Sequence, residues 1–195
     1  MIPGFTVNGL LPPFVGSSPT DMAGRAPFVT TIVDVVDRYA NSPERLVILD
    51  GLLRYREALH RVGLVSGFQW IDGSFSEAIE AIENRPPNDV DVVTFYYRPA
   101  SATSDPAWAA FQAQNQRALE GLFRSPLPKQ SFKCDAYPVE LDMGPIDLVS
   151  FTHYCFGLFS HRRQTFEWKG LIEVPLFDAV LDGEARRLLT ARGGP

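Results

Sequence analysis

Two aspartates separated by a single residue open the segment of the chain that most resembles a β-strand. Asp89 and Asp91 stand at the start of VDVVTFYY, residues 90–97, which is rich in β-branched and aromatic residues. Residues two apart in a strand project from the same side, so both carboxylates face one way. Carboxylates this close repel each other, and one takes up a proton unless a cation compensates them. The pair therefore predicts a site for Mg²⁺ or Mn²⁺, which take one or two carboxylates together with phosphate oxygens and water.

A glycine-serine turn upstream of the aspartates supplies the second half of a phosphate-binding arrangement. Gly73 and Ser74 directly follow GFQWID, residues 67–72, which is predicted to be a short strand. A glycine lets the backbone approach a ligand closely, and a helix that begins at this turn offers free amides to an anion. The hydroxyl of Ser74 adds a further hydrogen-bond donor for a phosphate. A phosphate-binding turn beside metal-binding carboxylates is suited to phosphoryl or nucleotidyl transfer.

The segment IDGSF followed by DVDVV resembles the signature of the DNA polymerase β-like nucleotidyltransferase superfamily. That signature is a hydrophobic strand, Gly followed by Gly or Ser, a spacer, and then Asp-hydrophobic-Asp/Glu-hydrophobic. The resemblance implies that Gly73 and Ser74 hold the triphosphate of a nucleoside triphosphate. It also implies that Asp89 and Asp91 bind Mg²⁺. A third acid on a later strand binds a second metal ion and orients the attacking hydroxyl, and Asp135 in FKCDAYPV is the best match for it.

The chain departs from the superfamily signature at three points. Asp72 precedes the glycine, where a hydrophobic or neutral residue is more usual. Fourteen residues separate the serine of the turn from the first aspartate of the pair, which is slightly longer than the common spacer. Glu140 and Asp142 lie close enough in the sequence to compete with Asp135 as the third acid. These departures favour a second hypothesis, a catalytically inactive module that keeps the scaffold and binds a nucleotide or a protein partner.

The whole chain is similar to an uncharacterised bacterial family of nucleotidyltransferase-like proteins. The segments that carry this similarity are MIPGFTVNGLLPP, IDGSF and WKGLIEVPL. The expected activity is a metal-dependent transfer of a nucleotidyl group, with ATP as the expected donor. The acceptor hydroxyl is left open among a small molecule, a tRNA end and a protein side chain. Small bacterial enzymes with this signature often serve in toxin–antitoxin or antiphage systems, and this association rests on family likeness alone.

Each candidate also has a plainer interpretation. PPND before the predicted strand is typical of a turn, in which Asp89 caps the turn and Asp91 is exposed at the strand end. Ser74 fits the N-cap of a helix, a role that is compatible with phosphate binding. Asp135 fits an exposed position on a strand. The spacing between the glycine-serine turn and the two aspartates favours the metal site over the plain turn. Both interpretations of Asp135 stay open.

Basic residues gather in SHRRQTFEWK, residues 160–169. Such a cluster neutralises a triphosphate in some sites. More often it is a solvated helix end, whose positive side chains complement the helix dipole. We favour the second interpretation for Arg162 and Arg163, and we keep Lys169 as a candidate nucleotide-binding residue.

The elements that must position these residues alternate along the chain. Alternating helices and strands indicate an α/β (α+β) fold with a mixed β-sheet flanked by helices. The helix over 145–159 is expected to be mostly buried, and Pro138 indicates either that its strand lies at a sheet edge or that the strand ends early. The predicted helices are 26–39, 42–64, 74–83, 105–124, 145–159 and 178–191, and the predicted strands are 67–72, 90–97, 131–141 and 165–177.

The bulk properties set the domain organisation. A length of 195 residues fits one domain, and we expect an extended Pro/Gly-rich arm over 1–25 and a single nucleotidyltransferase-like domain over 26–195. A net charge of −5 argues against binding nucleic acid through net charge alone. The chain shows no secretory leader and no apolar run long enough for a bilayer, so we expect a cytoplasmic protein without a membrane partner.

Overall fold

In the computed structural model, which describes residues 1–195, all the strands assemble into one mixed sheet. The sheet has five strands in the order β1-β5-β2-β3-β4. β2 runs antiparallel to both of its neighbours, β5 and β3, whereas β4 runs parallel to β3 and β1 runs parallel to β5. The strands are β1 Phe28–Val29, β2 Gly67–Asp72, β3 Val90–Tyr96, β4 Cys134–Glu140 and β5 Ile172–Pro175. The predicted α/β fold class is confirmed.

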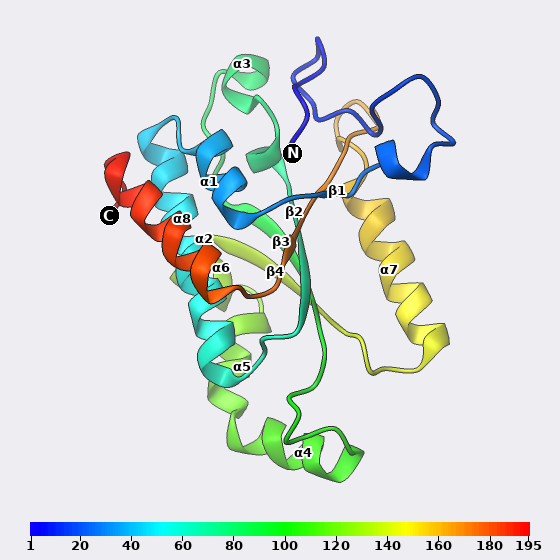
Figure 1. Cartoon of the computed structure of the whole chain (residues 1–195), viewed down its shortest axis with the longest axis vertical. Helices are drawn as coiled ribbons and strands as arrows, with labels where there is room; N and C mark the ends of the chain where they lie inside the picture. The colour runs from blue at the N-terminus through cyan, green and yellow to red at the C-terminus, as the bar shows by residue number, and fades with distance from the viewer.

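Helices cover the two faces of the sheet unequally. α1, α2, α5, α6 and α8 lie on one face, and α7 lies alone on the other (Figure 1). α3 lies beyond the end of the sheet at which β2 finishes, and α4 lies beyond the opposite end (Figure 1). The helices are α1 Ile32–Tyr39, α2 Pro43–Val62, α3 Ile79–Glu83, α4 Asp105–Gln114, α5 Gln116–Phe123, α6 Leu127–Phe132, α7 Pro145–Phe159 and α8 Ala179–Ala191.

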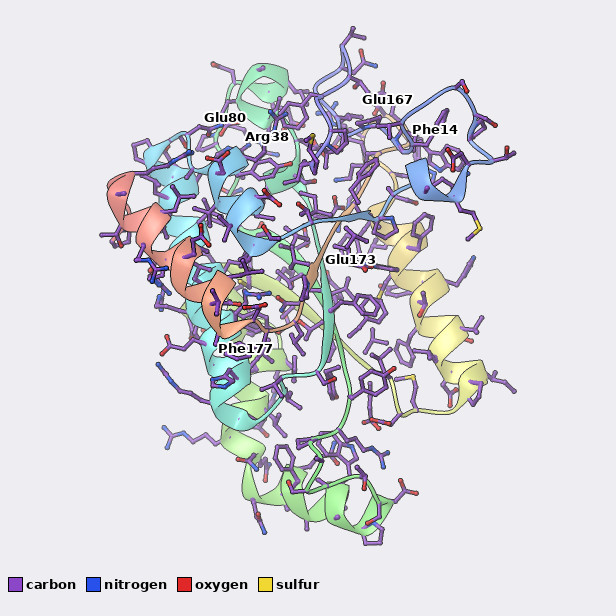
Figure 2. The ribbon with its side chains drawn as sticks, viewed as in Figure 1. Phe14, Arg38, Glu80, Glu167, Glu173 and Phe177 are labelled. Atoms are coloured by element: carbon purple, nitrogen blue, oxygen red, sulfur yellow. The ribbon has the colours of Figure 1, made fainter.

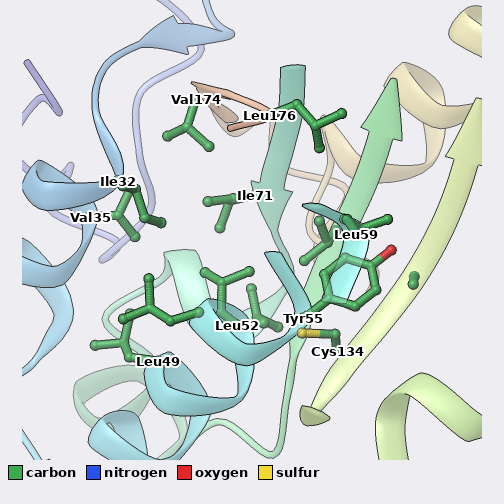
Figure 3. Packing of buried hydrophobic residues seen from close by; sticks show 14 of the residues in the cluster. Ile32, Val35, Leu49, Leu52, Tyr55, Leu59, Ile71, Cys134, Val174 and Leu176 are labelled. Atoms are coloured by element: carbon green, nitrogen blue, oxygen red, sulfur yellow. The ribbon is translucent and has the colours of Figure 1, made fainter. Parts of the chain in front are cut away.

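The alternation of side chains along the strands divides the core into two layers. Val90 and Val92 of β3 join a cluster of 28 buried residues between the sheet and the α2 side, part of which is drawn in Figure 3. Val93 and Phe95 face the opposite side and join seven buried residues beneath α7. Asp91 lies between Val90 and Val92, so the pleat directs its side chain to the α7 side.

The helix predicted with the clearest caps forms as expected. Ser42 accepts a hydrogen bond from the backbone amide of Arg45, Pro43 occupies the first turn of α2, and Gly63 ends the helix at φ 95°. The helix predicted over 26–39 is wrong in its first turn. Residues 28–29 instead form β1 beside β5, and α1 starts only at residue 32 after a capping box.

Two further predictions of secondary structure are corrected. The helix expected over 105–124 breaks at Asn115 into α4 and α5, and its N-cap is Ser104. Between the helix predicted to end at 124 and the strand predicted to start at 131, the structure has α6, a helix of six residues that begins after Pro126 and extends into the predicted strand. Pro138 does lie on an edge strand, as predicted, because β4 is the last strand of the sheet.

The expectation that the helix over 145–159 is mostly buried is wrong. Only Cys155 and Phe159 of α7 are buried, while Ile146 is 82% exposed and Val149 and Tyr154 are also exposed. The physical reason is that α7 covers its face of the sheet alone, so only its inward side has a partner (Figure 1).

The first 25 residues lie against the domain through backbone contacts. The amide of Ala78 donates to the carbonyl of Gly9 at 2.8 Å, and the amide of Gly170 donates to the carbonyl of Leu11 at 2.9 Å. Nδ2 of Asn8 in this arm donates to Oε1 of Glu167 in the segment after α7, and Glu167 is labelled in Figure 2. No helix is both long enough and apolar enough to cross a membrane.

Candidate functional site

Three aspartates lie side by side across three neighbouring strands. Asp91 of β3 is the register partner of Asp72 of β2 and of Asp135 of β4. All three side chains share the α7 side of the sheet, because each lies an even number of residues from an inward-facing residue of the smaller core cluster. Asp89 lies one residue before β3, on the same side as Asp91. The register of the sheet thus gathers acids that are far apart in the sequence.

These side chains open into a pocket of about 220 Å³ at the end of β2, which we call the strand-end pocket. Its walls are the turn after β2, the starts of β3 and β4, and the segment that follows α7. All six predicted site residues line it: Gly73, Ser74, Asp89, Asp91, Asp135 and Lys169. The lining also includes the charged residues Asp72, Glu77, Glu83, Arg85, Lys129, Arg162 and Arg163.

The turn after β2 depends on a glycine. Gly73 has φ 82°, a conformation that side chains of L-residues rarely adopt. A Cβ atom at this position would lie 2.0 Å from Oδ2 of Asp91, so the missing side chain makes room for that carboxylate. The backbone continues into a single 3-10 turn, Ser74–Ser76, before α3 begins at residue 79. The short helix expected to begin at this turn therefore starts five residues later than predicted.

Lys169 is held by three acceptors. Its Nζ lies 2.9 Å from Oε1 of Glu77, 3.1 Å from the carbonyl oxygen of Gly73 and 3.1 Å from Oδ2 of Asp72. The side chain is 4% exposed. Burial by itself lowers the pKa of Lys169, but the carboxylates of Asp72 and Glu77 outweigh it and the pKa is raised. Two of the three donors of this ammonium group make hydrogen bonds, to Gly73 and Glu77, and its charge also pairs with Asp72.

Asp72 is the most deeply buried acid of the pocket. Ser76 donates its hydroxyl to Oδ1 of Asp72 at 2.8 Å. Oδ2 has no partner in hydrogen-bonding geometry, although the ammonium of Lys169 lies within ion-pair distance. Burial raises the pKa of Asp72, and the charge of Lys169 acts in the opposite direction. The ion pair with Lys169 therefore supports a carboxylate that burial disfavours.

Asp91 stands among like charges without a cationic partner. Burial and the carboxylates of Asp72, Asp89 and Asp135 together raise the pKa of Asp91 to about 7. No ion pair involves Asp91, and the more distant Lys169 only partly offsets the repulsion. Such a group has a strong tendency to gain a proton or a cation.

Asp89 has a partner that sequence analysis did not identify. Lys129 of α6 forms an ion pair with Oδ2 of Asp89 at the mouth of the pocket. The hydrogen bond to Asp89 raises the pKa of Lys129, and the charges of Asp135 and Asp91 add to the effect. No helix was predicted over 127–132, so nothing in the local sequence placed this lysine near the aspartates.

The preferred interpretation of Arg162 as part of a solvated helix end is wrong. Its side chain is only 11% exposed in the pocket wall, where Nε lies 3.6 Å from Oε2 of Glu77 and Nη2 pairs with Glu83. Arg163 lines the same pocket but is exposed and forms no ion pair. Arg163 is thus the one arginine or lysine of the lining that lacks an acidic partner.

The structure separates the three candidates for the third acid. Glu140 pairs with Nε of Arg98 at 2.6 Å, and Oδ2 of Asp142 accepts from the amide of Arg98 at 2.7 Å. Both lie at the far end of β4, away from the pocket. Only Asp135 lines the pocket, where its Oδ2 lies 3.4 Å from the hydroxyl of Tyr137.

Residues 3–175 match a family described as a family of unknown function, DUF6932. The chain belongs to DUF6932. Neither a curated protein nor a solved structure matches it. The strand-end pocket lies within the matched DUF6932 region, since all of its lining residues precede residue 175.

The carboxylates of the strand-end pocket fit a divalent cation whose remaining coordination positions are filled by a phosphate ligand and water. No three His, Cys, Asp or Glu side chains are grouped closely enough to enclose a metal ion by themselves. Mg²⁺ rarely needs such a cage, because it is commonly held by one or two carboxylates together with phosphate oxygens and water. Asp91 with its raised pKa and its neighbour Asp135 supply that number of carboxylates. The residues present therefore fit Mg²⁺ or Mn²⁺ bound together with a phosphate group.

Proposed function

We propose that the strand-end pocket binds a nucleoside triphosphate, with ATP as the expected donor, and transfers its nucleotidyl group to an acceptor hydroxyl. The observation that carries this proposal is the row of aspartates across β2, β3 and β4, facing one pocket beside the glycine-serine turn. A divalent ion held by Asp91 and Asp135, together with phosphate oxygens, would neutralise charge on the phosphates during the reaction.

The residues of the chain have separate roles in this proposal. The hydroxyl of Ser74 makes no hydrogen bond within the protein and is free to donate to a phosphate oxygen. Arg163 offers an unpaired guanidinium at the pocket rim for the same charge. Lys169 is a positioning residue, because its donors fix the carbonyl of Gly73 and the side chain of Glu77. In this proposal Lys169 acts on the nucleotide indirectly, by holding the turn, and its expected contact with the nucleotide stays a prediction.

The proposed reaction is an in-line displacement at the α-phosphorus. The acceptor oxygen forms a bond to the α-phosphorus while the bond to the oxygen bridging the α- and β-phosphates breaks. Pyrophosphate leaves with that electron pair, and Asp135 orients the acceptor hydroxyl and accepts its proton. The acceptor remains a small molecule, a tRNA end or a protein side chain. Action in the cytoplasm, within a toxin–antitoxin or antiphage system, is part of the proposal.

Transfer of label tests this activity. The protein is incubated with each α-³²P-labelled triphosphate, Mg²⁺ and cell extract, and RNA and protein are examined for label. The expected result is labelling by one triphosphate, lost in Asp91→Asn and kept in Asp147→Asn. Asp147 is a matched control, because it makes the same change on the exposed first turn of α7, outside the pocket. Absence of label together with absence of calorimetric ATP binding would reject the proposal.

The second candidate is an inactive module that binds a nucleotide or a protein partner. Its support is that Lys129 and Lys169 already pair with two of the pocket aspartates. In that case calorimetry detects Mg²⁺-dependent ATP binding that Asp91→Asn abolishes, while no acceptor becomes labelled.

A further inference from the structure

The acids of the strand-end pocket differ in whether a lysine compensates them. Nζ of Lys169 lies 3.1 Å from Asp72 at the buried end of the pocket. Lys129 contacts Asp89 at the opposite, more open end, where the lysine side chain is 51% exposed. Two of the aspartates thus carry an internal counterion.

Asp91 and Asp135 have no such counterion. They are direct register partners on parallel neighbouring strands, and both side chains face the pocket. Neither takes part in an ion pair, and the only side-chain hydrogen bond to either comes from the hydroxyl of Tyr137. Two adjacent carboxylates in a partly buried site repel each other, and when both are ionised this pair carries a charge of −2 that no lysine or arginine compensates.

The position of Lys129 is fixed by the packing of α6. The carbonyl of Phe132 lies so close to Gly51 of α2 that a Cβ atom there would be 2.0 Å from it. Nη1 of Arg54 donates to the carbonyl of Ser131 at 3.1 Å. α6 is therefore seated on α2 by contacts on the side away from the pocket, and Lys129 extends from an anchored helix to Asp89.

We propose that Lys129 and Lys169 are built-in counterions and that one divalent cation binds between Asp91 and Asp135. This differs from the arrangement expected from sequence, in which Asp89 and Asp91 form the metal pair and Asp135 takes a second ion. It rests on the metal-dependent part of the proposed function. One divalent ion balances the two uncompensated carboxylates, whereas a second ion near Asp89 must compete with a tethered ammonium group.

Manganese titration tests the number and position of ions. The full-length protein is treated with EDTA, dialysed, and titrated with Mn²⁺ alone, and free Mn²⁺ is measured by electron paramagnetic resonance. We expect one Mn²⁺ per wild-type chain. Asp91→Asn and Asp135→Asn should each weaken binding by about tenfold or more, because each removes half of the charge. Asp89→Asn should change the affinity by less than about threefold, because its charge is already compensated.

Lysine variants test the counterion role directly. Lys129→Met should tighten Mn²⁺ binding by about tenfold or admit a second ion, because it frees the charge of Asp89. Lys133→Met is the matched control, since it makes the same change at the C-cap of α6, outside the pocket lining, and should leave binding unchanged. Circular dichroism verifies that each variant is folded.

Several results would overturn the inference. These are two ions in the wild type, no saturable Mn²⁺ binding, equal losses in Asp89→Asn and Asp91→Asn, or no effect of Lys129→Met. The outcome is separable from that of the proposed activity. If the wild type binds one Mn²⁺ but transfers no label, this inference holds and the proposed activity is rejected. If label is transferred and two ions bind, the activity holds and this inference is rejected.

Discussion

At the scale of single residues, the strand-end pocket depends on Gly73, which has no side chain, and on Asp91, whose carboxylate has no cationic partner. Gly73 leaves the space that Oδ2 of Asp91 occupies, and Asp91 lies between two register partners of the same charge. Both features follow from the strand register, so the chemistry of each residue depends on a neighbour at least 18 residues away in the sequence.

Replacing Gly73 tests whether the carboxylate needs this space. Gly73→Ala should destabilise the protein by roughly 2–5 kcal/mol, because a positive φ and a clash with Asp91 act together. Gly16→Ala is the control, since Gly16 has φ 97° and nothing within 4 Å of the added Cβ, and it should cost roughly 1–2 kcal/mol. Urea unfolding measures both. Equal costs would show that the clash with Asp91 is unimportant.

The raised pKa of Asp91 predicts how the stability of the metal-free protein changes with pH. The folded state holds this proton up to about pH 7, whereas the unfolded chain releases it near 3.8. The stability gained from the bound proton is therefore complete below about pH 4 and is lost as the pH rises to about 7. The free energy of unfolding should fall by at most about 1.4 kcal/mol per pH unit from this group.

Urea unfolding in EDTA between pH 5 and pH 8 measures this dependence. Asp91→Asn should flatten the profile, because an amide does not titrate. Mn²⁺ should raise the stability of the wild type most at pH 8, where the carboxylate is ionised. If the wild type and Asp91→Asn have parallel profiles, Asp91 is not the group responsible.

At the scale of elements, the pocket depends on α6 as much as on the strands. α6 places Lys129 at Asp89, and it can do so because its C-terminal carbonyl reaches the backbone of α2 at Gly51. A glycine in the middle of a helix normally weakens that helix. In α2 the lack of a side chain allows another helix to dock.

Two glycine substitutions separate helix propensity from docking. Gly51→Ala should destabilise the protein by roughly 1–3 kcal/mol despite the better helix propensity of alanine, because the added Cβ meets the carbonyl of Phe132. Gly121→Ala in α5 adds a Cβ with nothing within 4 Å and should stabilise the protein by about 0.5–1 kcal/mol. Thermal unfolding distinguishes the two, and stabilisation by both would contradict the docking role.

Local patterns in the sequence were sufficient for some elements and insufficient for others. β2, β3 and α2 were predicted because their apolar patterns and caps lie within the segments themselves. β1 was missed because two residues become a strand only by pairing with β5, more than 140 residues later. Likewise, the glycine-serine turn and the aspartates were found from spacing, whereas Lys129 and Arg162 acquired their partners through tertiary contacts that no local spacing encodes.

At the scale of the whole molecule, the buried Arg56 joins α2 and β2 to the later elements β5 and α8. Nε and Nη2 of Arg56 in α2 donate to both carboxylate oxygens of Asp182 in α8, and Nη1 donates to Gln69 of β2 and to the carbonyl of Pro175. The side chain is 1% exposed. One residue thus connects the longest helix, two strands and the last helix.

Replacing Arg56 should lower the free energy of unfolding substantially. Arg56→Ala leaves Asp182 and Gln69 without their partner in a buried position and should cost roughly 3–5 kcal/mol. Arg61→Ala is the matched control on the same helix, where an exposed pair with Glu57 should contribute less than about 1 kcal/mol. Denaturant midpoints measure both, and similar midpoints would contradict the joining role of Arg56.

The bond from Lys169 to the carbonyl of Gly73 spans 96 positions of the chain. Ribosomes release a polypeptide from its N-terminus, so Asp72 and Glu77 emerge long before the ammonium group that neutralises them. Until then the nascent β-strands carry bare negative charges where the finished protein has an ion pair. The contacts of the pocket can therefore be completed only after residue 169 has been synthesised, and a polypeptide that stops before this residue cannot form them.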